Sequence, residues 1–191
     1  MTNAFTLNSS ALHLTDEQFF QLCQDNRDVQ FERNANGDLV IMPPTGGETG
    51  NRNFELSVDL GIWNRQTNLG VAFDSSTGFK LPNGADRSPD VAWIASDRWN
   101  ALTPQQKQRF LPLCPDFVVE LRSPSDNLEN LQRKMQEYRD NGTRLGWLLD
   151  PSSKTVEIYR RDRPIETLQN PSELSGEDVL PGFVLTLDRI W

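Results

Sequence analysis

Short apolar runs alternate along the chain with longer stretches in which apolar residues recur at helical spacing. Two of the runs, Phe117–Leu121 and Leu145–Leu149, are almost entirely apolar, which is typical of central strands covered on both faces. The stretch 127–140 between them carries its apolar residues on one side of a helix. This order of strand, helix and strand predicts a βαβ unit in which the two strands run parallel.

The same pattern predicts further elements on both sides of this unit. Helices are expected over Leu14–Cys23, Glu48–Gln66 and Trp99–Leu111, and strands over Phe31–Glu32, Asp38–Met42, Val71–Leu81, Asp90–Ala95, Thr155–Tyr159 and the end of Val179–Leu187. The dipeptide Asn36-Gly37 is typical of the tight turn of a hairpin and joins the first two of these strands.

Local signals place several helix ends. Thr15 is the expected N-cap of the first helix, and Asp126 and Glu129 have the spacing of a capping box before the helix 127–140. Asn141-Gly142 is the expected stop of that helix. The expected apolar side of the long helix Glu48–Gln66 contains Phe54, Val58 and Ile62, with Leu60 and Trp63 as further candidates.

Together these elements predict an α/β (α+β) fold, a central mixed β-sheet flanked by helices. The chain has 191 residues, which suits a single domain with a sizeable core. No stretch approaches the roughly 18 apolar residues of a membrane span, and residues 1–10 lack the basic and apolar regions of a signal peptide. A cytoplasmic protein without a membrane partner is therefore expected.

Composition removes support from several function classes. The only histidine, His13, precedes a predicted helix and is expected to be a surface or capping residue, so a Ser-His-Asp mechanism lacks support. Cys23 and Cys114 lie far apart without a partner motif and indicate neither a disulfide framework nor a zinc site. The formal net charge of −8 argues against a tight metal-free DNA binder, but it is compatible with a metal-dependent nuclease, whose site is itself acidic.

Two acidic residues stand beside strand-like runs and suggest a metal site. Asp90 follows Pro89 at the start of a predicted strand, and Glu120 interrupts the run Phe117–Leu121. A buried carboxylate is costly unless it is paired, hydrogen-bonded or bound to a cation, and Mg²⁺ is typically held by one or two carboxylates with waters and phosphates. Simpler alternatives stay open at this point: Asp90 as a turn cap, and Glu120 as the structural partner of an arginine.

Two further residues are candidates because of their place on predicted helices. Lys134 lies one turn before Tyr138, at the edge of the buried side of the helix 127–140, so its ammonium group can reach the sheet. The alternative is a lysine that ends in solvent. Glu48 begins the second helix, where an acid more commonly just interacts with the helix dipole.

Several motifs in the same order resemble the Uma family of putative restriction endonucleases, within the PD-(D/E)XK nuclease superfamily. The motifs are Pro-Thr-Gly-Gly-Glu-Thr-Gly (44–50), Arg-Ser-Pro-Asp (87–90), Cys-Pro-Asp-Phe-Val-Val-Glu-Leu-Arg-Ser-Pro-Ser-Asp (114–126), Lys-Met-Gln-Glu-Tyr (134–138) and Gly-Trp-Leu-Leu-Asp-Pro (146–151). The resemblance covers about residues 15–187. It implies a restriction-endonuclease-like fold with the acids at one end of a central mixed sheet.

The resemblance also implies roles for the candidate residues. Asp90 and Glu120 match the two acids of the superfamily motif and would bind Mg²⁺ or Mn²⁺, together with Glu48 and the carbonyl of Leu121. Arg122 occupies the position where the motif expects lysine. Because arginine does not give up its proton in a protein, it cannot act as the base that activates water.

The superfamily is known to relocate this lysine to the next helix, and Lys134 is the expected replacement. Tyr138 or Arg122 would contact the backbone of the nucleic acid. The expected activity is metal-dependent hydrolysis of phosphodiester bonds, with DNA as the partner and a homodimer as the assembly suited to cutting both strands. The alternative is a catalytically inactive module of the same fold for DNA binding or protein interaction.

Overall fold

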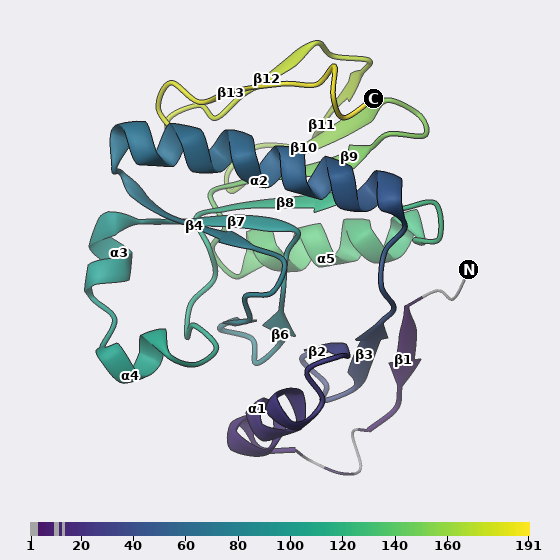
Figure 1. Cartoon of the computed structure of the whole chain (residues 1–191), viewed down its shortest axis with the longest axis vertical. Helices are drawn as coiled ribbons and strands as arrows, with labels where there is room; N and C mark the ends of the chain where they lie inside the picture. The colour runs from purple at the N-terminus through teal and green to yellow at the C-terminus, as the bar shows by residue number, and fades with distance from the viewer. Residues whose placement is uncertain (1–3, 10–11, 13) are drawn as a thin grey trace.

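The structure is a computed structural model that describes residues 4–9, 12 and 14–191. It consists of a central mixed sheet with a long helix on each face and a second, smaller sheet below it (Figure 1). His13, which was expected to be a surface or capping residue, lies outside the described residues. The described part of the chain contains no helix that is long and apolar enough to cross a membrane.

The central sheet has the strand order β11-β10-β9-β8-β7-β4. Its strands are Glu166–Gln169 (β11), Thr155–Arg160 (β10), Leu145–Asp150 (β9), Phe117–Leu121 (β8), Val91–Ala95 (β7) and Gly70–Asp74 (β4). Strands β8 and β9 are parallel, and the other neighbours are antiparallel. The helix α5 (Leu128–Asp140) connects β8 to β9, so the predicted βαβ unit is confirmed.

The two long helices cover opposite faces of this sheet (Figure 1). On one face lies α5, whose Met135 and Tyr138 are fully buried. On the other face lies α2 (Gly47–Thr67), and the sheet here is also covered by the two-stranded ribbon of β12 (Glu173–Ser175) and β13 (Val184–Thr186). This ribbon includes the predicted C-terminal strand together with a partner strand that was not predicted.

The predicted apolar side of α2 is wrong for Phe54 and Ile62 and is confirmed for the further candidates Leu60 and Trp63. Phe54 and Ile62 are 63% and 48% exposed, whereas the buried residues of the helix include Leu56, Leu60 and Trp63. Both sets recur at helical spacing, because the helix carries apolar residues around much of its circumference. The sheet packs against the set that contains the large Trp63 ring, whose burial removes the most apolar surface from water.

Three other predicted boundaries also differ. The stretch Trp99–Leu111 forms two short helices, α3 (Ser96–Asn100) and α4 (Pro104–Lys107), because Thr103 caps a new helix that Pro104 begins. The N-cap of α5 is Asn127, whose side chain accepts from Asn130 N, instead of the predicted capping box. The predicted strand Val71–Leu81 is divided between β4 and β5 (Phe79–Lys80), which belong to different sheets.

The second sheet has the order β1-β3-β2-β6-β5. Its strands are Phe5–Leu7 (β1), Leu39–Met42 (β3), Gln30–Arg33 (β2), Asp86–Arg87 (β6) and Phe79–Lys80 (β5). The predicted hairpin corresponds to β2 and β3, and the predicted first helix is α1 (Asp16–Asp25) with Thr15 as its N-cap. The chain then passes from β6 to β7 through Ser88-Pro89-Asp90, so these three residues connect the two sheets.

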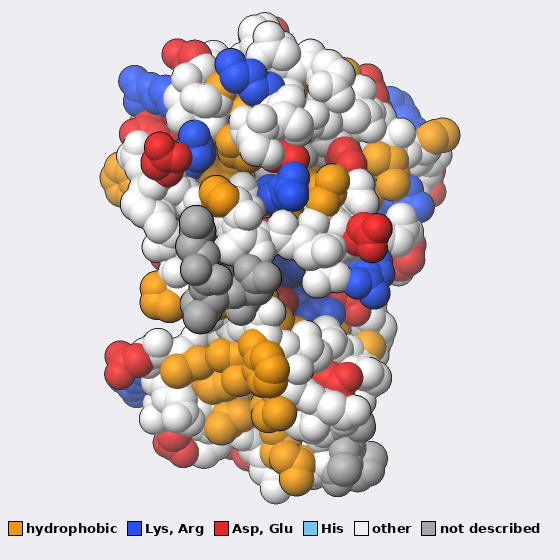
Figure 2. All heavy atoms as spheres, turned by 90° about the vertical axis from the view of Figure 1, so that its right-hand side faces the viewer, with side chains coloured by type: hydrophobic (Ala, Val, Ile, Leu, Met, Phe, Trp, Pro, Cys, Tyr) orange, Lys and Arg blue, Asp and Glu red, His pale blue; other side chains and the backbone are white. Residues whose placement is uncertain are grey.

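One face of the second sheet is apolar and exposed. Phe5, Ile41 and Phe31 lie opposite one another across β1, β3 and β2, and Phe5 and Leu7 are 58% and 42% exposed. Figure 2 shows a patch of apolar side chains over the lower part of the molecule, where Figure 1 places this sheet. Side chains on the opposite side of β2, including Glu32, are turned toward the central sheet and α5.

Candidate active site

The two candidate acids lie next to each other at one edge of the central sheet. Val91 of β7 pairs with Val119 of β8 in an antiparallel register, so Asp90 and Glu120 are the next residues along the two strands. The backbone N–H of Leu121 donates to Oδ2 of Asp90 at 2.8 Å. Glu120 is 4% exposed, although a glutamate with an ordinary pKa is ionised at neutral pH. Strand pairing therefore brings both acids to one place, as the sequence predicted.

Lys134 points from α5 into the same place. Its Nζ lies 2.8 Å from Oε1 of Glu120 and 2.8 Å from Oε1 of Glu32, and its side chain is only 13% exposed. One turn further along α5, the hydroxyl of Tyr138 donates to Oε1 of Glu120 at 3.0 Å. The stems of both side chains cross the buried side of the helix, which places their polar ends over the sheet.

Glu32 is a third buried acid of the cluster, and the sequence analysis missed it as a site residue. It lies on β2 of the second sheet, where Oε1 accepts the backbone N–H of Ser88 at 2.9 Å and Oε2 lies 3.3 Å from Nη1 of Arg87. The available signal was a lone acid inside a short predicted strand. That signal does not say what the acid contacts, because its partners lie more than fifty residues away.

The charges of the cluster determine which groups are ionised. Burial raises the pKa of Glu120 to about 8, and repulsion from Asp90 and Glu32 adds to this against the attraction of Lys134. Burial likewise raises the pKa of Asp90. For Glu32, burial is outweighed by Lys134 and Arg87, which lower its pKa. At neutral pH, Glu32 is therefore ionised, whereas Glu120 holds a proton.

The lysine stays positively charged in this setting. Burial alone would lower the pKa of Lys134, but attraction to Glu120 and Glu32 outweighs it and raises the pKa. Burial, the negative charges of Glu120 and Glu32 and the hydrogen bond to Glu120 raise the pKa of Tyr138 well above its ordinary value. Both groups are therefore proton donors in hydrogen bonds, and neither is a base.

Helix α2 contributes Asn53 to the cluster. Its Nδ2 donates to Oδ1 of Asp90 at 2.8 Å, while its Oδ1 is buried and accepts no hydrogen bond from the described residues. The predicted acid of this helix, Glu48, does not join them: its side chain is 87% exposed and lies 3.6 Å from Arg52, one turn along the helix. The residue of α2 that reaches the acids is thus the amide of Asn53, five residues after Glu48.

Arg122 lies outside the contacts of the cluster. Its Nη1 lies 2.7 Å from Oδ2 of Asp150 at the end of β9, and its side chain is 28% exposed. Tyr138, which was predicted to touch the nucleic acid, is fully buried with its hydroxyl on Glu120. The structure contradicts that role for Tyr138, because a buried ring cannot reach a bound strand, and makes it a support for Glu120.

The polar atoms of the cluster fit a hard divalent cation. The hydrogen bonds that Glu120 accepts from described residues both go to Oε1, which leaves Oε2 without one. The unpartnered Oδ1 of Asn53 lies on a side chain that already contacts Asp90. The described residues contain no group of three or more His, Cys, Asp or Glu side chains that would hold a metal by themselves. Two carboxylates with waters and a phosphate are nevertheless a typical Mg²⁺ environment.

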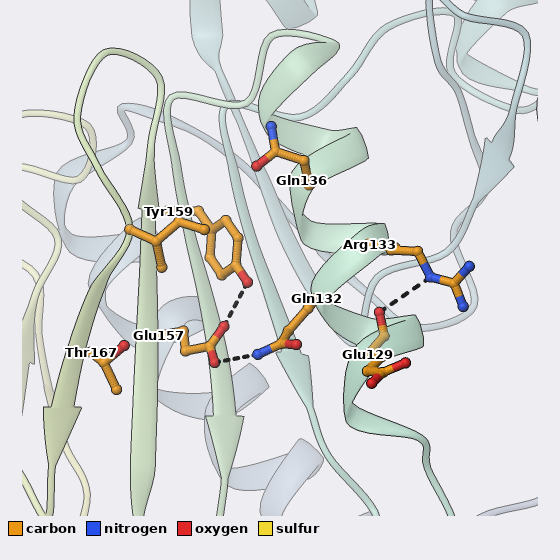
Figure 3. Close-up of a pocket in the computed structure, with 8 residues that line it drawn as sticks. Glu129, Gln132, Arg133, Gln136, Glu157, Tyr159 and Thr167 are labelled. Carbon is orange, nitrogen blue, oxygen red and sulfur yellow. Dashed lines mark hydrogen bonds between the residues drawn. The ribbon is translucent and has the colours of Figure 1, made fainter.

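A separate open groove lies between α5 and the strands β10 and β11 (Figure 3). Its central carboxylate, Glu157, accepts hydrogen bonds from Gln132 Nε2 and from the hydroxyl of Tyr159, both at 2.6 Å. None of the predicted site residues lines this groove. Its polar groups satisfy one another, so the converging acids and the buried lysine identify the better candidate site.

Comparison with known proteins identifies the family and the fold. A model of the Uma2 family, described as "Putative restriction endonuclease", matches residues 16–188. The crystal structure of a putative nuclease belonging to DUF820 from Anabaena variabilis ATCC 29413 has a TM-score of 0.77 and 18% sequence identity, covering 93% of this chain and 97% of that chain. No curated protein matches the chain. The structural match confirms the predicted fold of a central mixed sheet with flanking helices.

Proposed function

Because the chain belongs to the Uma2 family of putative restriction endonucleases, we propose that it is a metal-dependent nuclease that hydrolyses phosphodiester bonds of DNA. The observation that supports this proposal best is the convergence of Asp90, Glu120 and Lys134 at one edge of the central sheet. Two acids can hold the metal ion that such a hydrolysis uses, and a charged lysine can offset the negative charge of the phosphate.

The acids and the amide form the cation-binding side of the proposed site. Asp90 and Glu120 would hold Mg²⁺ or Mn²⁺, with Asn53 Oδ1 as a further oxygen within the cluster. When bound, such an ion lowers the pKa of a water and offsets the negative charge of the phosphate. Asn53 and the N–H of Leu121 each hold one oxygen of Asp90, which fixes the orientation of this carboxylate.

Lys134 supplies a fixed positive charge at the phosphate. Because Glu120 and Glu32 raise its pKa, the ammonium group orients water or neutralises phosphate, and it does not accept a proton. Tyr138 holds Oε1 of Glu120 from the buried side. Arg122, which is partly exposed and held by Asp150, is the proposed contact to the nucleic-acid backbone.

A cleavage assay tests the function directly. The wild type should cut plasmid, linear or single-stranded DNA with Mg²⁺ or Mn²⁺, and Glu120→Ala should fall to background. Glu157→Gln is the matched control, since Glu157 is an acid of the separate groove beside α5. Equal activity of the wild type and Glu120→Ala, or no cleavage of any DNA form with either metal, would contradict the proposal.

A second candidate is the inactive module of the same fold. It is favoured by one observation: the ammonium of Lys134 already bridges Glu120 and Glu32, which completes a buried ion cluster without a metal. Calorimetry with Mn²⁺ separates the two candidates. Binding that is lost in Asp90→Ala favours the nuclease, and no binding by a folded wild type favours the inactive module.

We also propose that the nuclease acts as a homodimer, because two symmetric sites are the simplest way to cut both strands. The proposed contact is the apolar row formed by Phe5, Ile41 and Phe31 on the second sheet. Phe5 lies on β1, an edge strand that pairs only with β3 among the described strands. Figure 2 shows no charged side chain inside the patch, so two copies that each carry a net charge of −8 can meet there without direct repulsion.

A further inference from the structure

We propose that Glu32 is a positioning residue of the site, which keeps the ammonium of Lys134 in place and ties it to the Ser88–Asp90 segment. The inference rests on the proposed function, because the position of Lys134 matters only if the site binds a cation and phosphate. Glu32 comes from the second sheet, so this sheet would be a structural part of the catalytic centre.

The contacts of Glu32 connect three separate elements. Its Oε1 receives both Nζ of Lys134 at 2.8 Å and the N–H of Ser88 at 2.9 Å. Ser88 lies two residues before Asp90, so one carboxylate oxygen joins α5 to the segment that presents the first acid of the site. Glu32 is 3% exposed, so its carboxylate depends on these contacts in place of hydrogen bonds to water.

Glu32 is itself held by a second ion pair. Arg87 places Nη1 at 3.3 Å from Oε2 of Glu32, and its Nε lies 2.6 Å from Glu137 on α5. The guanidinium group also donates to Asn34 at 2.9 Å. Glu137 and Asn34 thus hold the guanidinium group of Arg87 beside Oε2 of Glu32. The other oxygen, Oε1, is left to Lys134 and Ser88.

This arrangement solves a conflict within the proposed site. Lys134 contacts Oε1 of Glu120, and the same carboxylate would bind the cation. Glu32 pairs with Lys134 independently of Glu120, so Lys134 keeps a carboxylate partner when Glu120 binds a cation. Without Glu32, Glu120 would be the only carboxylate among the described residues in an ion pair with Lys134, and the ammonium group would compete with the cation for it.

The test compares Glu32→Gln with Glu137→Gln. Glu32→Gln keeps the shape of the side chain and the acceptor for Ser88, but it removes the negative charge beside Lys134. Glu137→Gln removes a negative charge beside the same Arg87 and leaves the contacts of Lys134 unchanged. The first readout is metal-free: the rate at which acetic anhydride modifies Lys134, followed by mass spectrometry at neutral pH. We expect a rise of about ten-fold or more in Glu32→Gln and little change in Glu137→Gln.

The second readout is Mn²⁺ affinity by calorimetry. We expect it to fall about ten-fold in Glu32→Gln and to recover when Lys134→Met is added, because the competing ammonium group is then gone. Equal protection of Lys134 in a folded Glu32→Gln would overturn the inference. If the wild type binds no Mn²⁺ but Lys134 loses protection as expected, the positioning role stands and the nuclease proposal fails.

Discussion

Nζ of Lys134 lies 2.8 Å from Oε1 of Glu120, and this pair joins α5 to the edge of the central sheet. It is also where the requirements of folding and of catalysis meet. The pair holds the ammonium group at the edge of the sheet in the folded protein, yet the same carboxylate has to be open to a cation in the proposed reaction. The predictions below follow from that double role and from the surfaces around it.

Removal of Lys134 should cost both stability and activity. In Lys134→Met, the charge of Glu32 loses one of its two cationic partners inside the protein. Breaking a buried pair in this way typically costs about 3–5 kcal/mol of unfolding free energy. Urea unfolding measures this cost, and cleavage should fall by about 10²-fold or more.

A double-mutant cycle checks the cause of that loss. Adding Glu32→Gln to Lys134→Met removes the uncompensated charge, so the double variant should be more stable than Lys134→Met alone. Additive losses from the two substitutions would show that the residues do not interact.

The fold of the centre could be predicted from the sequence because its signals are local. The all-apolar run Phe117–Leu121 leaves few alternatives to a buried strand, and the capped helix after it leads directly into the next strand, Leu145–Asp150. Asp90 and Glu120 could be found because each interrupts or borders such a run. Lys134 could be found because helical spacing places it beside the buried Tyr138.

The remaining site residues depend on contacts that no local pattern encodes. Glu32 meets Ser88 and Asn53 meets Asp90 only after the second sheet and α2 have packed, at separations of 56 and 37 residues. The buried face of α2 could be predicted only in part, through Leu60 and Trp63, since apolar residues lie around much of that helix. Glu48 satisfied a motif, but α2 is oriented so that its side chain extends into solvent.

Stability should depend on pH through Glu120. Its pKa is raised from about 4.5 to about 8 on folding, so between these values the folded state binds more protons than the unfolded state. The stabilising contribution is complete below pH 4.5 and is lost as the pH rises through 8, with a limiting slope of about 1.4 kcal/mol per pH unit.

Urea unfolding of the wild type and Glu120→Gln at several pH values measures this contribution. The difference in unfolding free energy between the two should decline from pH 5 to pH 8, because glutamine does not titrate. Glu157→Gln, at the separate groove, should show the pH dependence of the wild type. Parallel curves for the wild type and Glu120→Gln would contradict the raised pKa.

The apolar face of the second sheet should control assembly. Phe5→Glu places a charge at the β1 end of the apolar row and should convert a dimer to a monomer in sedimentation velocity. Phe54→Glu is the control, because Phe54 is similarly exposed but lies on α2. A monomeric wild type at high protein concentration, or a dimer that is equally weakened by both substitutions, would count against this surface.

Cation binding should release a proton below pH 8. Glu120 holds a proton at neutral pH, since burial raises its pKa to about 8, and it has to lose that proton before it can bind Mn²⁺. Apparent Mn²⁺ affinity should therefore increase as the pH rises from 6 toward 8, by up to about ten-fold per pH unit.

Calorimetry at pH 6.5 in two buffers of different ionisation enthalpy should give heats of binding whose difference corresponds to about one proton released per ion bound. Asp90→Ala should abolish the binding heat, and Glu157→Gln should leave both the affinity and the proton release unchanged. A heat of binding that is independent of the buffer would mean that Glu120 is already ionised or does not bind the cation.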